Sequence, residues 1–267
     1  MPKIIVITSG KGGVGKTTTA INLGAAMNHF GKDVLILDAN LSTPNVGLHL
    51  GSPEVPINLN HILNGKADVF EGVYEHESGI KIIPSSLSVK ELSRLKPERL
   101  LKFKKDFKKV ADIVIVDCAA GLGSEASCAI KLADEVILVT NPEMPALTDA
   151  LKTLKLAEQF NKPITGVIVT KVKKDDIELQ PATVKDMLEA PILGMVPEDD
   201  SVRESLNMKN AVVYTHPKSN AARAYKEIAA QLIGEEYDSD DDKERLFSKI
   251  LSFLGFSRKE EQEEKED

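Results

Sequence analysis

The chain has 267 residues, of which 42% are hydrophobic and 28% are charged, and its formal net charge is −7. A chain of this length can bury one large core without disulfide staples, and its acidic balance argues against bulk attraction to nucleic acid. It has two cysteines, no signal-peptide pattern in residues 1–10 and no apolar run of about 20 residues, and together these features predict a cytoplasmic protein.

Seven short apolar runs alternate with helical patterns along residues 1–234. The runs are KIIVIT, DVLILD, IKIIP, DIVIVD, EVILVT, ITGVIVT and PILGMV. They are continuous rather than alternating, which is typical of strands that are buried on both faces. Residues 16–30 and 147–160 carry apolar residues at steps of three and four, as helices do. The alternation predicts an α/β fold with a doubly wound, mostly parallel sheet that binds ligands at the carboxyl ends of its strands.

The first predicted strand runs directly into GKGGVGKT, which matches the phosphate-binding pattern G-x-x-x-x-G-K-[ST]. Glycines let the backbone curl so that successive N–H groups point at a phosphate, and the dipole of the following helix favours an anion there. We expect Lys16 to bridge the β- and γ-phosphates of ATP and the Thr17 hydroxyl to bind Mg²⁺. The predicted nucleotide-binding residues of this loop are Gly10, Lys11, Gly12, Gly13, Val14, Gly15, Lys16, Thr17 and Thr18.

The stretch KGGVGKTT resembles the deviant Walker A box of the MinD/ParA group of P-loop ATPases, which are relatives of the nitrogenase iron protein. In that group, the lysine in the place of Lys11 reaches across a twofold interface to the phosphates of the partner's nucleotide. The resemblance implies that Lys11 and Lys16 are catalytic and that ATP drives homodimerisation. A solvent-facing Lys11 that merely attracts anions is the alternative.

Two carboxylates are predicted to lie at strand ends, where VLILDAN places Asp38 and IVIVDCAAG places Asp117. Both should face the loop across the carboxyl edge of the sheet, and Thr17, Asp38 and Asp117 are the predicted magnesium-site residues. By the resemblance, Asp117 holds the metal through water, and the DCAAG segment is a switch loop in which Gly121 permits movement. The alternative for each aspartate is that it only caps the loop that follows.

One departure from the MinD pattern lies beside Asp38. MinD-like proteins usually carry D-x-D at this place, whereas this chain has Asp38-Ala39-Asn40. Asparagine can hydrogen-bond a water molecule but cannot accept its proton. Because positioning can suffice for a dissociative transition state, Asp38 and Asn40 both remain predicted catalytic residues, with slow hydrolysis and a long-lived ATP-bound dimer as the hypothesis.

Base recognition rests on resemblance alone. The segments VTNPEMPAL and MVPEDDSVRES resemble the stretches that lie near the adenine in the MinD group. This implies that Asn141, Thr170, Lys171 and the backbone around Pro197 contact the nucleotide. Thr170 stands where many relatives have an adenine-reading asparagine.

Two other patterns favour packing over function. In LLKFKKDFKK, residues 100–109, helical spacing predicts that Leu100, Phe103 and Phe107 are buried together while the lysines stay solvated, rather than forming a nucleic-acid face. Cys118 and Cys128 do not match the cluster ligands of the iron protein and are predicted to pack in the core.

The character of the chain changes after residue 234. We predict an ATPase domain at 1–234, an acidic linker at 235–242, an amphipathic helix at 243–258 and a charged disordered tail at 259–267. The helix has basic flanks and resembles the membrane-targeting helix of MinD, and paired copies in a dimer would bind an anionic membrane by avidity. Packing on the body or in a partner's groove are the alternatives. The apolar residues are Leu246, Phe247, Ile250, Leu251, Phe253 and Leu254.

The resemblance therefore implies a MinD-like ATPase switch that is cytoplasmic, joins the membrane in its ATP-bound state, and recruits an unidentified partner protein for positioning the division site or polar structures. A ParA-like partition protein would need a basic DNA-binding face, and no nucleic-acid partner is expected. A metal-cluster carrier like Mrp would want a Cys-x-x-Cys pair, which this chain lacks.

Overall fold

A computed structural model describes residues 1–92, 96–173 and 181–237 of the chain. The chain divides into two compact units, Met1–Glu235 and Glu236–Asp267, and every strand and helix of the described residues belongs to the first. The predicted linker, amphipathic helix and tail lie almost wholly outside the described residues, so the proposed division of this segment stays a prediction.

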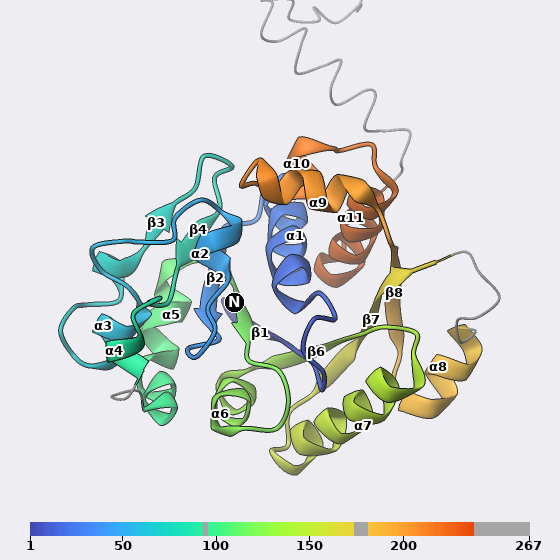
Figure 1. Cartoon of the computed structure of the whole chain (residues 1–267), viewed down its shortest axis with the longest axis horizontal. Helices are drawn as coiled ribbons and strands as arrows, with labels where there is room; N and C mark the ends of the chain where they lie inside the picture. The colour runs from blue at the N-terminus through green and yellow to red at the C-terminus, as the bar shows by residue number, and fades with distance from the viewer. Residues whose placement is uncertain (93–95, 174–180, 238–267) are drawn as a thin grey trace, which may run out of the picture. The chain divides into compact units, whose positions relative to one another are not determined.

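The described residues form one eight-stranded sheet in the order β3-β4-β2-β5-β1-β6-β7-β8 (Figure 1). Paired strands are parallel except at the edge, where β3 runs antiparallel to β4. The predicted mostly parallel sheet is thus confirmed, and all seven apolar runs are strands. The strands are β1 (Lys3–Thr8), β2 (Val34–Ala39), β3 (Tyr74–Glu75), β4 (Lys81–Ile83), β5 (Ile113–Cys118), β6 (Glu135–Thr140), β7 (Ile164–Val172) and β8 (Ile192–Pro197).

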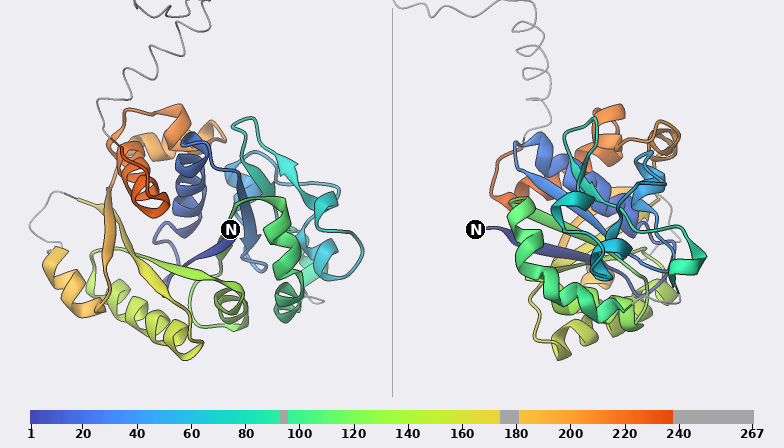
Figure 2. Two further views of the ribbon diagram at one scale, coloured as in Figure 1. Left: turned by 180° about the vertical axis from the view of Figure 1, so that it is seen from behind. Right: turned by 90° about the vertical axis from the view of Figure 1, so that its left-hand side faces the viewer.

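Helices cover both faces of the sheet, as the two further views make plain (Figure 2). Within the described residues the α-helices are α1 (Lys16–His29), α2 (Val46–His49), α3 (Leu59–Leu63), α4 (Val89–Leu92), α5 (Lys104–Val110), α6 (Ser124–Leu132), α7 (Met144–Gln159), α8 (Pro181–Leu188), α9 (Asp200–Asn207), α10 (Val212–Thr215) and α11 (Asn220–Ile233). Two 3₁₀ helices, η1 (Phe70–Gly72) and η2 (Pro97–Phe103), complete the set. None of these helices combines the length and apolarity that a bilayer crossing requires.

The core follows from the alternation of side chains along each strand. Ile5 and Ile7 of β1 point to the face that α1, α10 and α11 cover, whereas Ile4 and Val6 point to the face under α5 and α6. Because both faces are covered, every residue from Ile4 to Thr8 is buried, which explains the continuous apolar runs.

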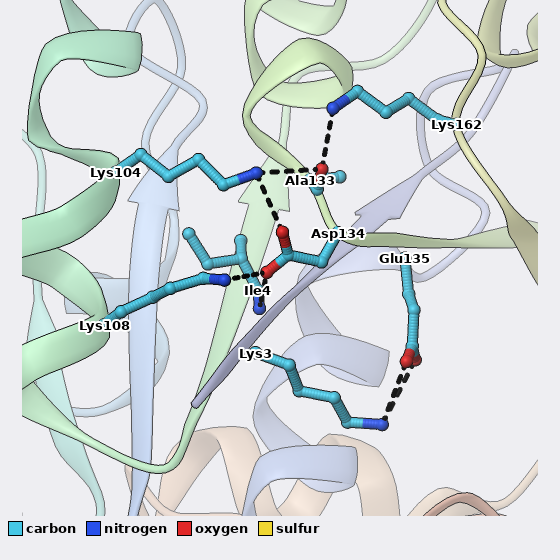
Figure 3. A network of polar contacts seen from close by, with 8 residues as sticks. All are labelled: Lys3, Ile4, Lys104, Lys108, Ala133, Asp134, Glu135 and Lys162. Atoms are coloured by element: carbon cyan, nitrogen blue, oxygen red, sulfur yellow. Dashed lines mark hydrogen bonds and ion pairs between the residues drawn. The ribbon is translucent and has the colours of Figure 1, made fainter. Parts of the chain in front are cut away.

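The prediction for residues 100–109 is partly wrong. Leu100 and Phe107 are fully buried and Phe103 packs beside them, as expected, in a segment that is a 3₁₀ helix followed by α5. Lys104 and Lys108, however, are not simply solvated. Their ammonium groups lie 2.8 and 2.7 Å from the two carboxylate oxygens of Asp134, which precedes β6 (Figure 3).

Candidate nucleotide-binding site

The glycine-rich loop leaves the carboxyl end of β1, which lies between β5 and β6 in the sheet, and enters α1. Gly13 and Gly15 have φ angles of 79° and 94°, in the left-handed region that side chains with a Cβ rarely adopt. Gly10 is required by a close approach, because a Cβ there would lie 2.1 Å from the carbonyl oxygen of Asp149 in α7. The backbone therefore curls tightly over the start of the helix.

Among the described residues, this curl leaves a row of backbone N–H donors unpaired. No described residue accepts a hydrogen bond from the backbone N–H groups of Gly12, Gly13, Val14 or Gly15, and Gly15 caps α1 without a side-chain bond. Lys16, the first residue of α1, is only 8% exposed. Unpaired N–H groups, a helix N-terminus and a lysine together form a site for phosphate groups.

The loop is braced by the end of β7. The Thr170 hydroxyl donates to the Val14 carbonyl at 2.5 Å, and the Lys171 ammonium donates to the Gly13 carbonyl at 2.8 Å. Asn141, at the end of β6, does not line the cleft but donates to the carbonyl and hydroxyl oxygens of Thr170. Thr170 and Lys171 thus contact the loop directly, and Asn141 contacts Thr170 from the neighbouring strand.

The predicted metal-site residues converge beside the loop. The Thr17 hydroxyl donates to Oδ2 of Asp117 at 2.6 Å, while the other carboxylate oxygen, Oδ1, is buried and has no partner within the described residues. Burial raises the pKa of Asp117 to about 6, although the charge of Lys16 and the Thr17 hydrogen bond oppose that rise. Carboxylate and hydroxyl oxygens suit Mg²⁺, and the free buried Oδ1 fits a cation or its water shell.

Asp38 lies opposite Asp117 in the register of β2 and β5. Its Oδ2 accepts from the backbone N–H groups of Asn45 and Val46 at 3.0 Å, and its Oδ1 accepts from that of Asn40 at 3.2 Å. Burial, and then the negative charge of Asp117, raise the pKa of Asp38 well above its ordinary value. Asp38 therefore anchors the loop between β2 and α2, and its metal contact stays a prediction.

Asn40 is tied into the same loop. Its amide nitrogen donates to the Thr43 carbonyl at 2.5 Å, and its amide oxygen accepts from the Thr43 hydroxyl at 3.0 Å. Asn40 is 8% exposed and lines the cleft, so it is placed beside the site but both ends of its amide are engaged.

A cavity of about 570 Å³ lies over the loop and the start of α1. Ten of the predicted residues line it: Gly12, Gly13, Gly15, Lys16, Thr17, Thr18, Asn40, Thr170, Lys171 and Pro197. The remaining predicted residues, which do not line it, are Gly10, Lys11, Val14, Asp38, Asp117 and Asn141.

Sequence reasoning missed much of the cavity wall. One wall comes from the β2–α2 segment and the opposite wall from β8, α9 and α11. The MVPEDDSVRES segment already pointed to the region of Glu198–Arg203, whereas nothing local in the sequence marks His49 or Tyr225. The missed residues are Thr43, Asn45, His49, Ala120, Val196, Glu198, Asp199, Asp200, Val202, Arg203, Leu206 and Tyr225.

A central parallel strand, a G-x-x-x-x-G-K-T loop opening a helix, and a strand-end aspartate bonded to the loop threonine define the class of P-loop nucleotide-binding proteins. Residues 5–212 match the family model of the CobQ/CobB/MinD/ParA nucleotide binding domain. The chain belongs to this family, as the resemblance implied, and it is a P-loop ATPase.

Known relatives cover nearly the whole chain. An uncharacterised ATP-binding protein of Methanocaldococcus jannaschii is 40% identical over 252 residues, which span 94% of this chain and 96% of that protein. The septum site-determining protein MinD of Pyrococcus horikoshii, solved with Mg-ADP, is 33% identical, with a TM-score of 0.83 over 87% of this chain and 96% of that one. A chain of the MinC:MinD cell division protein complex of Aquifex aeolicus is 29% identical, with a TM-score of 0.79 over 88% and 97%.

Proposed function

We propose that this ATPase is a MinD-like switch. Mg²⁺ and ATP bind in the cleft, and ATP closes two copies into a homodimer. The dimer associates with an anionic membrane and recruits a partner protein for spatial positioning, and hydrolysis then releases it. The membrane contacts are assigned to Leu246, Phe247, Ile250, Leu251, Phe253 and Leu254.

The observation that carries this proposal is the placement of Lys11. Its side chain is 44% exposed, it is not among the described residues that line the cavity, and its ammonium lies 3.3 Å from the carboxylate of Glu143. A lysine in a phosphate-binding loop that does not face its own cavity is available to another molecule's nucleotide. An exposed ion pair of this kind contributes at most about 1 kcal/mol, so the ammonium is readily released.

The surface around Lys11 supports contact with a second copy. Leu122 is 48% exposed in the loop after β5, and Met144, next to Glu143 in the chain, is 53% exposed. The Gly121 N–H bonds to the Ser9 carbonyl at 2.9 Å, which brings the loop that carries Leu122 to the glycine-rich loop. Exposed apolar side chains next to residues that contact the loop suit a protein interface that forms when the nucleotide is bound.

The chemistry assigned to the site is phosphoryl transfer from ATP to water. Thr17, Asp38 and Asp117 would hold Mg²⁺, which when bound would neutralise charge on the phosphates. The loop N–H groups and Lys16 stabilise the negative charge that develops on the phosphate oxygens, and Lys11 of the second copy adds a further cation. Asn40 orients the attacking water with the amide N–H and the oxygen lone pair that its two bonds to Thr43 do not use. Hydrolysis is slow because an amide cannot take the proton of that water.

The assignment to positioning rests on the relatives. The Pyrococcus neighbour is a septum site-determining protein, and the Aquifex neighbour was solved with MinC, so a protein partner and a role in division are proposed for this chain too. The predicted amphipathic helix adds membrane association, with a cytoplasmic resting state.

The central test is a comparison of Lys11→Ala with the parent chain in the presence of Mg²⁺ and a non-hydrolysable ATP analogue. Light scattering should find the parent chain dimeric and the variant monomeric, while both bind the analogue with similar affinity. Lys152→Ala in α7, whose lysine is exposed and paired with Asp149, is the matched control and should dimerise. A Lys11→Ala protein that dimerises like the parent would refute the role in trans.

Membrane association is tested by co-sedimentation with anionic liposomes. Binding should need the ATP analogue and should be lost on deleting residues 243–267 or in Leu251→Glu. Binding to DNA in place of liposomes would contradict the proposal and favour a partition protein.

A further inference from the structure

We propose that Thr170 and Lys171 are positioning residues for the glycine-rich loop. By holding the carbonyls of Val14 and Gly13, they aim the N–H groups of Gly15 and Val14 at the phosphates of the bound nucleotide. This inference deepens the proposed nucleotide site and rests on it.

The Thr170 side chain is used to hold the glycine-rich loop. It is 3% exposed, its hydroxyl oxygen lies 2.5 Å from the Val14 carbonyl and 3.2 Å from the Thr140 carbonyl, and it accepts from the Asn141 amide at 3.1 Å. A hydroxyl has one hydrogen to donate, and here the shorter contact is to Val14. Thr170 therefore has no hydrogen left for the edge of a base.

Lys171 reaches the loop because β7 is irregular at that residue. Thr170 pairs with Val196 of β8 and Val172 pairs with Pro197, so Lys171 is an extra residue between two paired positions. Its φ angle is 56°, an uncommon conformation for a residue other than glycine. Bulges of this kind commonly redirect a side chain next to a functional site, and here the ammonium reaches the Gly13 carbonyl at 2.8 Å.

Because the peptide group is planar, these two hydrogen bonds also fix the directions of the next N–H groups in the loop. In a trans peptide, the carbonyl of one residue and the N–H of the next point in opposite directions. Holding the Val14 carbonyl toward Thr170 turns the Gly15 N–H away from β7, and holding the Gly13 carbonyl toward Lys171 does the same for the Val14 N–H. Neither N–H has an acceptor within the described residues, so both remain available to phosphate oxygens.

This arrangement separates two roles that Thr170 could play. A residue that reads the base would change the preference between ATP and GTP. A residue that positions the loop would change affinity for the phosphate chain itself, whatever base is attached. The bonds of Thr170 favour the second role.

The test measures affinities of the full chain for ATP, GTP and inorganic tripolyphosphate, each with Mg²⁺, by calorimetry. Thr170→Val keeps the shape but removes the hydroxyl, and it should weaken all three ligands by a common factor of about ten, the effect of losing one well-placed hydrogen bond. Thr170→Ser should restore the parent affinities. Lys171→Met removes the ammonium group of an exposed side chain, and it should also weaken tripolyphosphate binding.

Thr153→Val is the matched control, because Thr153 is fully buried in α7 and its hydroxyl donates to a carbonyl of its own helix. It should lower thermal stability as much as Thr170→Val does, without lowering the affinity for any of the three ligands. A changed ATP to GTP ratio with unchanged tripolyphosphate affinity would overturn the inference, as would unchanged affinities in both Thr170→Val and Lys171→Met. Failure of the parent chain to bind any of the three ligands would instead refute the proposed nucleotide site.

Discussion

The Thr17 hydroxyl and the Asp117 carboxylate are joined by a 2.6 Å hydrogen bond that engages only one of the two carboxylate oxygens. The second oxygen is buried without a partner within the described residues, so the carboxylate is half satisfied. A buried charge of this kind is costly unless a cation or water compensates it. The relationship therefore predicts how stability and metal binding depend on the charge of Asp117.

Asp117→Asn should stabilise the nucleotide-free protein at alkaline pH. Burial raises the pKa of Asp117 from its ordinary value of 3.8 to about 6. The folded protein therefore binds this proton more tightly than the unfolded chain does, and stability is lost as pH rises through about 6. Two pKa units correspond to roughly 3 kcal/mol, so the Tm of the variant at pH 8 should exceed that of the parent by about 8 °C.

With Mg²⁺ and ATP added, the parent should have the higher Tm of the two proteins, since the variant lacks the charge that suits the metal. Scanning fluorimetry at pH 5 and pH 8, with and without Mg²⁺-ATP, makes the comparison. A parent protein that gains stability between pH 5 and pH 8 without ligand, relative to the variant, would contradict the assignment.

Lys16→Ala should weaken nucleotide binding by about 100-fold. Lys16 is the buried cation at the start of α1, and losing a charge-assisted contact to phosphate lowers affinity by about 100-fold. Fluorescence titration with a labelled ATP measures it, and circular dichroism checks that the variant is folded. Retention of parental affinity would show that the loop binds phosphate through its backbone alone.

The sheet could be predicted because both its faces are covered, so each strand is a continuous apolar run. The two-residue strand β3 escaped detection because Tyr74 and Glu75 carry no pattern of their own. The loop was predictable for a different reason. Its glycines, lysine and threonine are close together in the sequence and form a recognisable local pattern.

The far wall of the cavity follows from packing between distant segments. Tyr225 of α11 lines the cavity, and its hydroxyl lies 3.2 Å from that of Thr19 in α1. The two residues are 206 positions apart in the sequence. Helical spacing predicts that Phe107 is buried, but it cannot predict that Lys104 forms an ion pair with Asp134. Such contacts leave no periodic trace in the sequence.

Asn40→Asp should raise the rate of ATP hydrolysis by at least about tenfold, because a carboxylate can take a proton from the attacking water. Single-turnover and steady-state phosphate release measure the rate, and the ATP-bound dimer should be shorter-lived. Asn45→Asp is the control, since it adds the same charge to the same loop, where Asn45 bonds to Thr43. If turnover is unchanged in Asn40→Asp, or rises equally in both variants, the hypothesis of slow hydrolysis through Asn40 is wrong.

Asp134→Asn should destabilise the fold, because Asp134 joins three segments at the amino ends of the strands, whereas the cleft lies at their carboxyl ends. Its carboxylate receives Lys104 and Lys108 of α5 and the backbone N–H of Ile4 in β1 (Figure 3). Burial alone would raise its pKa, but the hydrogen bonds from these lysines and from Ile4 outweigh that effect and lower the pKa to about 2. This carboxylate therefore contributes stability above pH 4, and the contribution is lost as pH falls through about 2.

The lowered pKa corresponds to about 2 kcal/mol, so the variant should unfold at a Tm about 6 °C below that of the parent at pH 7, and the gap should narrow by pH 3. Asp106→Asn removes an exposed ion pair with Lys109 in the same helix and should shift Tm by less than about 2 °C. Equal shifts in the two variants, or a gap that persists undiminished into acid, would mean that Asp134 does not act through its charge.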